Sequence, residues 1–163
     1  MRRVAFSGPS NSGKTTLIIK VAKILQEQGF KVGIIKHDPK DKASFDTPGK
    51  DSHRFSMLGA EVVVVSPTRT TYFSKEEKSI DEISDMLYEC DILIVEGLKH
   101  LDLPRISLFR GAIDESYLEF SKAIATNGLK CSVNIPNFDI NDASVVAKWV
   151  LDNAEVYIKK GAE

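Results

Sequence analysis

The chain has 163 residues, 42% of them hydrophobic and 28% charged, and its formal net charge is −1 at pH 7. This length supplies one full hydrophobic core and is short for two, so we expect a single domain over residues 1–163. The near-neutral charge argues against a nucleic-acid partner and against attraction to an anionic membrane, and no apolar stretch approaches the roughly 18 residues of a membrane span.

The first elements predict a strand–helix–strand unit. Residues 3–7 form a short apolar run that is typical of a buried strand. Apolar side chains at helical spacing predict a helix over residues 14–28, which Gly29 ends. A β-rich run follows at residues 31–35. Two strands joined by a helix in this way are parallel, and their crossover is right-handed.

Residues 36–51 have a different composition from the segments around them. They are polar and contain four lysines and two prolines, at positions 39 and 48. We expect a long, mobile loop, of a length that is uncommon inside a compact domain. Two interpretations stay open: the loop closes over a bound ligand, or it is a solvated excursion of the chain.

Beyond this loop, strands and helices alternate. Residues 61–65 predict another buried strand, and the threonine-rich run at 68–73 predicts an antiparallel strand at a sheet edge. Four consecutive aliphatic residues at 92–95 are typical of a strand buried on both faces. The remaining predicted elements are helices at 52–58, 80–88 and 142–151 and strands at 105–109 and 122–125.

The order of these elements predicts the fold class. We expect an α/β protein with a doubly wound, mostly parallel sheet between two layers of helices, in three αβα layers, and an extra hairpin at the edge. In folds of this class, ligands bind at the carboxyl ends of the strands. Functional side chains are therefore sought just after each predicted strand.

The most informative motif is GPSNSGKT at residues 8–15, a full match to the phosphate-binding loop (P-loop) pattern GxxxxGK(S/T). Gly8 and Gly13 allow backbone conformations that a Cβ would hinder, so successive N–H groups can point at phosphate oxygens. Lys14 can reach the β- and γ-phosphates, and the Thr15 hydroxyl can complete the shell of a Mg²⁺ ion. We therefore expect a P-loop NTPase fold that binds a nucleoside triphosphate. The predicted contacts in this loop are Gly8, Ser10, Asn11, Ser12, Gly13, Lys14, Thr15 and Thr16.

Glu96 supplies the second half of the predicted site. It follows the buried strand at 92–95, and in P-loop NTPases an acidic residue at the end of such a strand lies near Mg²⁺. We expect Glu96 to hold Mg²⁺ with Thr15, directly or through water, or to orient the attacking water. Glu96 and Lys14 are thus the predicted catalytic residues. The alternative is a strand-end carboxylate that only contacts solvent.

Two Lys-His pairs also follow predicted strands. Lys36-His37 comes after the second strand and Lys99-His100 comes shortly after Glu96. Both pairs are expected at the rim of the sheet where the nucleotide binds, with Lys36 contacting phosphate. A histidine there could relay a proton, or it could be an ordinary polar residue.

The choice of base is not determined by the sequence pattern. The NKxD guanine signature is absent, and Asn127, just after the predicted strand at 122–125, is placed where a carboxamide could read a purine edge. Gly128 beside it equally indicates a turn. GTP and ATP both stay open on these residues.

The N-terminus and the cysteines predict a cytoplasmic location. A strand begins directly after Met1, which leaves no room for a signal peptide. Cys90 and Cys131 are far apart in sequence and match neither a disulfide framework nor a CxxC metal site. We expect both to be reduced thiols that pack in the fold.

Several segments together resemble the MobB family of molybdopterin-guanine dinucleotide biosynthesis adapter proteins. The P-loop alone is shared by many proteins, whereas PGKDS followed by a GA pair and then VEGxKH is far more specific. The resemblance covers about residues 4–146. It is carried by GPSNSGKTTL at 8–17, IKH at 35–37, DTPGKDSHRF at 46–55, LGA at 58–60, VEGLKH at 95–100 and FDIND at 138–142.

This resemblance implies a GTP-binding adapter with weak GTPase activity that forms a homodimer. It further implies a partner, the guanylyltransferase that attaches GMP to molybdopterin, with molybdopterin as a candidate ligand. By matching position, Lys14 and Thr15 would bind phosphates and Mg²⁺, Glu96 would serve Mg²⁺ or water, and Lys36 and Asp51 would belong to the rim of the site.

Two alternatives remain open. One is a P-loop kinase acting on a nucleoside or another small molecule, although the loop at 36–51 carries no arginine of the kind that closes over phosphates in kinases. The other is a non-catalytic nucleotide switch or a metal-delivery protein. The lack of an evident arginine finger fits slow hydrolysis, since such a group contributes about 10³–10⁵ in turnover.

Overall fold

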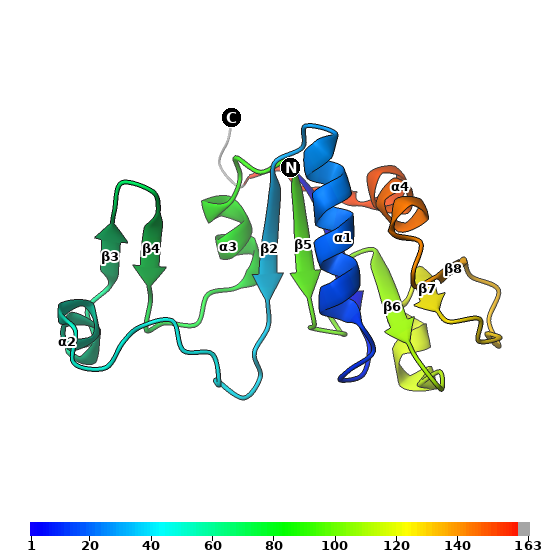
Figure 1. Ribbon diagram of the computed structural model, residues 1–163, viewed down its shortest axis with the longest axis horizontal. Helices are drawn as coiled ribbons and strands as arrows, with labels where there is room; N and C mark the ends of the chain where they lie inside the picture. Colours follow the sequence, from blue (N-terminus) through cyan, green and yellow to red (C-terminus); the bar gives the residue numbers. More distant parts are fainter. Residues whose placement is uncertain (160–163) are drawn as a thin grey trace. The chain divides into compact units, whose positions relative to one another are not determined.

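The central strand of the protein is β1 (Arg2–Ser7), whose residues 4–6 are fully buried. The computed structural model describes residues 1–159. The other elements follow in the order α1 (Lys14–Glu27), β2 (Val32–Lys36), α2 (Asp51–Met57), β3 (Val62–Val65), β4 (Thr70–Phe73), α3 (Ile80–Met86), β5 (Ile92–Glu96), β6 (Arg105–Phe109), the 3₁₀ helix η1 (Glu115–Phe120), β7 (Ala123–Thr126), β8 (Asn137–Asp139), α4 (Ala143–Asn153) and β9 (Glu155–Val156). Figure 1 labels most of them.

The main sheet has the strand order β2-β5-β1-β6-β7-β8, and all these strands are parallel. β9 pairs antiparallel with the start of β1. The chain moves from β1 to β2 on one side and later to β6 on the other, so the direction of winding changes at β1. Such a switch point opens a crevice at the carboxyl ends of the strands. The predicted α/β fold with a mostly parallel sheet is confirmed.

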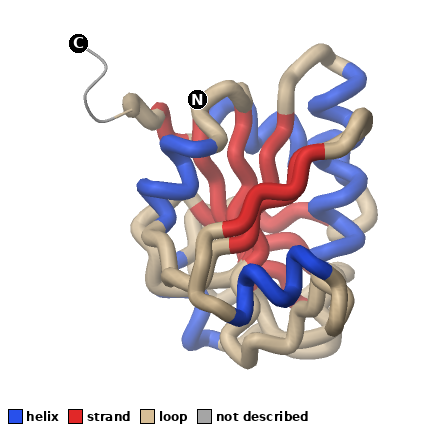
Figure 2. Tube along the Cα trace, turned by 90° about the vertical axis from the view of Figure 1, so that its left-hand side faces the viewer, coloured by secondary structure: helices blue, strands red, loops and turns tan. Residues whose placement is uncertain are grey.

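Helices α1 and α4 pack on the apolar sheet because each presents one apolar face. Helical segments lie on both sides of the main strands (Figure 2). On one side, α1 packs against α4, and both contribute to one buried cluster with β1, β5, β6 and β7. Within the described residues, no helix has the length and apolarity needed to cross a membrane.

The described chain divides into two compact units. The first contains Met1–His37 and the chain from Ser84 onward, and it holds the main sheet. The second, Asp38–Ile83, holds α2 and the hairpin of β3 and β4. The expectation of one nucleotide-binding domain over residues 1–163 stays a prediction.

The hairpin differs from the expectation in its burial and pairing. Both strands exist, but they form a two-stranded antiparallel sheet of their own rather than an edge of the main sheet. The strand predicted as buried is largely exposed: Val63 is 57% and Val65 75% accessible. A run of β-branched residues favours a strand, but its burial depends on tertiary cover.

Candidate nucleotide-binding site

The P-loop joins β1 to α1 through backbone conformations that glycine favours. Gly8 has φ of 135° and Gly13 has φ of 94°, and Asn11, with φ of 62°, is a rare non-glycine residue in the left-handed region. A Cβ on Gly8 would collide with the Leu108 carbonyl oxygen of the neighbouring strand β6. Glycine is therefore required here by both conformation and space.

Helix α1 begins at Lys14, directly after the loop. Its N-cap residue is Gly13, which provides no side-chain hydrogen bond to the first turn. The first N–H groups of a helix have no intrahelical acceptor, and the helix dipole makes this end positive. The start of α1 is thus built to accept an anion.

Lys14 lies folded over its own loop. Its Nζ donates hydrogen bonds to the carbonyl oxygens of Gly8 at 3.0 Å and Pro9 at 2.7 Å. Partial burial lowers the pKa of the Lys14 ammonium below its ordinary value; nearby Glu96 opposes this shift, and Lys36 adds to it. The charge of Lys14 is therefore influenced by both Glu96 and Lys36.

Glu96 lies beside the loop at the end of β5. The Thr15 hydroxyl donates a hydrogen bond to Glu96 Oε1 at 3.2 Å. In the sheet register, Glu96 is paired with Phe6 of β1 on one side and with Lys36 of β2 on the other. The structure therefore brings Thr15, Glu96 and Lys36 together, while their roles toward a ligand stay predictions.

The connection after β5 explains why Glu96 can end its strand there. Gly97, with φ of 101°, donates its backbone N–H to the Phe6 carbonyl oxygen at 2.9 Å. A Cβ at this position would lie 3.2 Å from the Cβ of His37. The glycine thus turns the chain away from the site while packing closely on the segment after β2.

A pocket of about 440 Å³ lies over the start of α1. It is lined by Asn11, Gly13, Lys14, Thr15, Thr16 and Arg110. Five of these are residues that the motif predicts; Arg110 is not. Arg110 follows β6 directly, so the rule that functional side chains follow parallel strands could have found it.

The remaining predicted loop residues are Gly8, Ser10 and Ser12. Gly8 shapes the loop, as described above, and Ser10 is exposed. Ser12 is buried, and its hydroxyl has no hydrogen-bond partner among the described residues. Its backbone carbonyl oxygen accepts a hydrogen bond from Arg110 Nε at 3.3 Å.

The Lys99-His100 pair does not approach the P-loop, contrary to the prediction. Lys99 lies over the Tyr117 ring, with its Nζ 5.1 Å from the ring centroid, and His100 makes an edge contact with Phe120. Both contacts are with residues of η1. The reason is the turn at residues 97–98, where Leu98 also has a positive φ of 50° and directs the chain away from the strand end.

Asn127 and Asp51 are among the predicted residues that do not line this pocket. Asn127 is exposed immediately beyond the end of β7, and Gly128 beside it has φ of 90°, as in a turn. Asp51 is the first residue of α2 in the other compact unit. The participation of Asn127 and Asp51 in a nucleotide site stays a prediction.

Arg105 is a second arginine that the sequence pattern did not reveal. It is the first residue of β6 and is fully buried. Its guanidinium donates to the carbonyl oxygens of Gly97 at 3.2 Å, Leu98 at 3.0 Å and Leu101 at 2.6 Å. Burial lowers the pKa of Arg105 below its ordinary value. This side chain fixes the segment that follows Glu96.

Comparison with known proteins agrees with this geometry. A family model for molybdopterin guanine dinucleotide synthesis protein B (MobB) matches residues 3–127. The molybdopterin-guanine dinucleotide biosynthesis adapter protein of Escherichia coli K12 is 28% identical over 161 residues, which cover 91% of each chain. A putative adapter protein of the same description from Methanocaldococcus jannaschii is 34% identical over 116 residues, or 68% of this chain and 48% of the relative.

Among solved structures, MobB proteins have a similar fold. The crystal structure of Bacillus subtilis MobB superposes with a TM-score of 0.77 at 24% identity, over 96% of this chain and 100% of that one. At this identity the superposition shows a shared fold. Because the family model spans most of the chain, from β1 to the residue after β7, the family is established independently: this protein belongs to the MobB family.

Proposed function

We propose that this protein binds GTP and Mg²⁺ at its P-loop and acts as an adapter in the guanylation of molybdopterin. The observation that carries the proposal is the contact between Thr15 and Glu96 at the mouth of a complete P-loop. The named activity of the family's members supports the biosynthetic role. The residues of the P-loop support the proposed nucleotide binding.

The chain's own residues suit these ligands. The N–H groups at the start of α1 face the phosphates, and Lys14 exchanges its two carbonyl partners for phosphate oxygens. The hydroxyl of Thr15 and the carboxylate of Glu96 lie 3.2 Å apart and are oxygen donors of the kind that Mg²⁺ prefers. When bound, Mg²⁺ neutralises charge on the β- and γ-phosphates.

Hydrolysis at this site is expected to be slow. Glu96 is the one predicted residue next to the loop that can orient a water molecule, and the Lys14 ammonium offsets charge on the phosphates. We therefore propose a weak GTPase whose main role is accessory. Among the predicted contacts, Lys36 lies at the same rim, and we propose that Asn127 contacts the base and that Asp51 belongs to the rim of the site.

The proposed partners follow from the family. We propose that the protein works as a homodimer with the guanylyltransferase that joins GMP to molybdopterin, and that molybdopterin itself is a candidate ligand. The proposed location is the cytoplasm. Cys90 and Cys131 are both free thiols, as expected in a reducing compartment.

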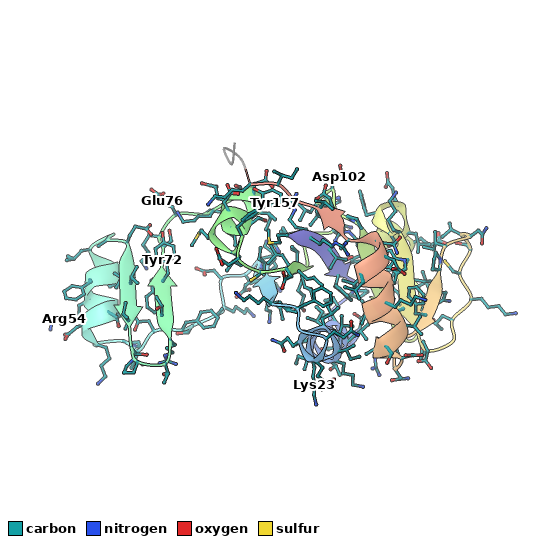
Figure 3. All side chains as sticks on the ribbon, turned by 90° about the horizontal axis from the view of Figure 1, so that it is seen from above. Lys23, Arg54, Tyr72, Glu76, Asp102 and Tyr157 are labelled. Atoms are coloured by element: carbon teal, nitrogen blue, oxygen red, sulfur yellow. The ribbon has the colours of Figure 1, made fainter. Side chains whose placement is uncertain are left out.

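The test is a guanylation assay with the purified guanylyltransferase at limiting GTP, together with direct measurement of GTP affinity. The wild-type protein should bind GTP and increase product formation. Lys14→Ala should abolish both effects, since it removes the only lysine of the loop. The matched control is Lys23→Ala on the same helix, whose side chain is 76% exposed and projects away from the sheet (Figure 3).

Three results would contradict the proposal. The first is equal affinity for GTP and ATP, and the second is no nucleotide binding at all. The third is unchanged GTP affinity in Lys14→Ala. The kinase alternative predicts a different result: rapid phosphate transfer that depends on an added alcohol acceptor. Slow phosphate release without an acceptor would argue against that alternative.

A further inference from the structure

Arg110 is held against the P-loop by two kinds of contact. Its Nε donates a hydrogen bond to the Ser12 carbonyl oxygen at 3.3 Å. Its guanidinium also lies directly over Gly13, where a Cβ would be 3.0 Å from Nε and 3.2 Å from Nη2. Gly13 therefore provides room for the arginine as well as the left-handed turn of the loop. The guanidinium therefore lies next to the residue that precedes the first turn of α1.

The charge of Arg110 is not balanced by the protein. The side chain is exposed, and within residues 1–159 its one hydrogen bond is the one that Nε makes to Ser12. No carboxylate in that part of the chain forms an ion pair with it. Arg110 lines the pocket, and its Nη groups form no hydrogen bond within residues 1–159, so these donors are available to a ligand. A guanidinium in this setting matches a phosphate, which can accept two parallel hydrogen bonds.

The position of Arg110 in the sheet separates it from the predicted metal site. β5, which carries Glu96, lies on one side of β1, and β6, which ends just before Arg110, lies on the other. The two side chains thus approach the loop from opposite flanks. Lys14 is the P-loop lysine, the residue type that reaches the terminal phosphates.

From this geometry we infer that Arg110 is a phosphate ligand of the bound nucleotide. The inference rests on the proposed nucleotide binding and adds a residue to it. Because Arg110 approaches from the flank opposite Glu96, its contact is with the part of the phosphate chain that GTP and GDP share. It is a binding residue, and Mg²⁺ is not needed for its contact.

The test compares GTP and GDP affinities of Arg110→Ala with those of the wild type, by calorimetric titration with and without Mg²⁺. A hydrogen-bonded charged contact contributes about 10- to 100-fold in affinity, so Arg110→Ala should weaken both nucleotides by such a factor. The loss should be equal for GTP and GDP and persist without Mg²⁺. Arg110→Lys should recover part of it, and Lys23→Ala should change nothing.

Urea unfolding distinguishes a purely structural role of Arg110 from a role in nucleotide binding. Since Arg110 is exposed, the midpoint of unfolding should be unchanged in Arg110→Ala. A lowered midpoint that accounts for the weaker binding would overturn the inference. So would unchanged affinity, or a loss confined to GTP. If Lys14→Ala abolishes binding while Arg110→Ala leaves the affinity for both nucleotides unchanged, the inference fails and the proposed function is retained. If the wild type binds no nucleotide, both fall.

Discussion

The contact between Thr15 and Glu96 is one hydrogen bond between two side chains, so a substitution of either residue removes it. A hydroxyl on the first turn of α1 meets a carboxylate at the end of β5, and the two belong to segments 81 residues apart. The parallel register of β1 and β5 brings them together, since Phe6 is paired with Glu96. A one-residue change of register would turn the carboxylate to the opposite face of the sheet.

Replacing Glu96 by glutamine should separate Mg²⁺ binding from nucleotide binding. Glu96→Gln keeps the size of the side chain but removes its charge, so GTP should still bind without Mg²⁺. The affinity of the GTP-loaded protein for Mg²⁺ should fall about 10- to 100-fold, the loss typical when a metal site loses a supporting group. Titration of Mg²⁺ into that complex measures the change.

The matched control for this prediction is Glu27→Gln. Glu27 is the last residue of α1, and its side chain is 64% exposed. The substitution removes one carboxylate from the same unit without touching the loop. An equal loss of Mg²⁺ affinity in both variants, or no loss in Glu96→Gln, would contradict the assignment of Glu96 to the metal.

At the scale of elements, the connection from β5 to β6 depends on one buried cation. The Arg105 guanidinium donates hydrogen bonds to three backbone carbonyl groups of the segment 97–101, which contains no helix or strand. Leu98 and Leu101 each also accept one backbone N–H, so the arginine adds a charged donor to both, and each hydrogen bond of this kind contributes about 1.5–3 kcal/mol. The arginine thus replaces the hydrogen bonds that a regular element would supply.

Arg105→Leu should therefore destabilise the protein strongly. The leucine fills much of the space but removes three hydrogen bonds from a charged donor, so the free energy of unfolding should fall by about 3 kcal/mol or more. Urea unfolding followed by circular dichroism measures it. Arg2→Ala, which removes an exposed arginine with a single bond to the Leu151 carbonyl oxygen, should cost about 1 kcal/mol or less. Similar losses in the two variants would refute this account.

Local patterns predicted the main sheet because its strands are apolar on both faces. β1 and β5 are continuous buried runs, and such runs have few other folded interpretations. β8 and β9 were not predicted, since they are short and polar. β8 is linked to β7 by a hydrogen bond from the Thr126 hydroxyl to Asn137 Oδ1 at 3.0 Å, a contact between side chains that no periodicity reveals.

The candidate site was predictable to the extent that its residues follow from motifs. The loop and the position of Glu96 follow from the P-loop pattern and the buried strand before the acid. Arg110 could have been found only by its place directly after β6, and Arg105 lies in no pattern, because the partners of both are backbone carbonyl groups of segments that the fold brings near. Lys99-His100 was misplaced since the strained turn at Leu98 has no marker except Gly97.

At the scale of the whole molecule, the hairpin of the second unit presents an apolar face to solvent. Val63 and Val65 of β3 are cross-strand neighbours of Tyr72 and Thr70 in β4, so these four side chains share one face. Val63, Val65 and Tyr72 are 57%, 75% and 39% exposed, and Figure 3 labels Tyr72 on this hairpin. We call these three side chains the hairpin patch. Exposed apolar patches on a small protein commonly mark interaction sites.

The proposed homodimer predicts that the hairpin patch is buried between two copies. Fully burying one valine contributes about 1.5–3 kcal/mol, and a two-fold interface counts each residue twice. The double substitution Val63→Lys and Val65→Lys should therefore convert the dimer to a monomer, measured by sedimentation equilibrium, while leaving each copy folded because both side chains are exposed. Ile19→Lys, at a 60% exposed position on α1, should leave the dimer intact. A monomeric wild type would contradict the dimer itself, whereas a dimer that survives the double substitution would place its interface on another surface.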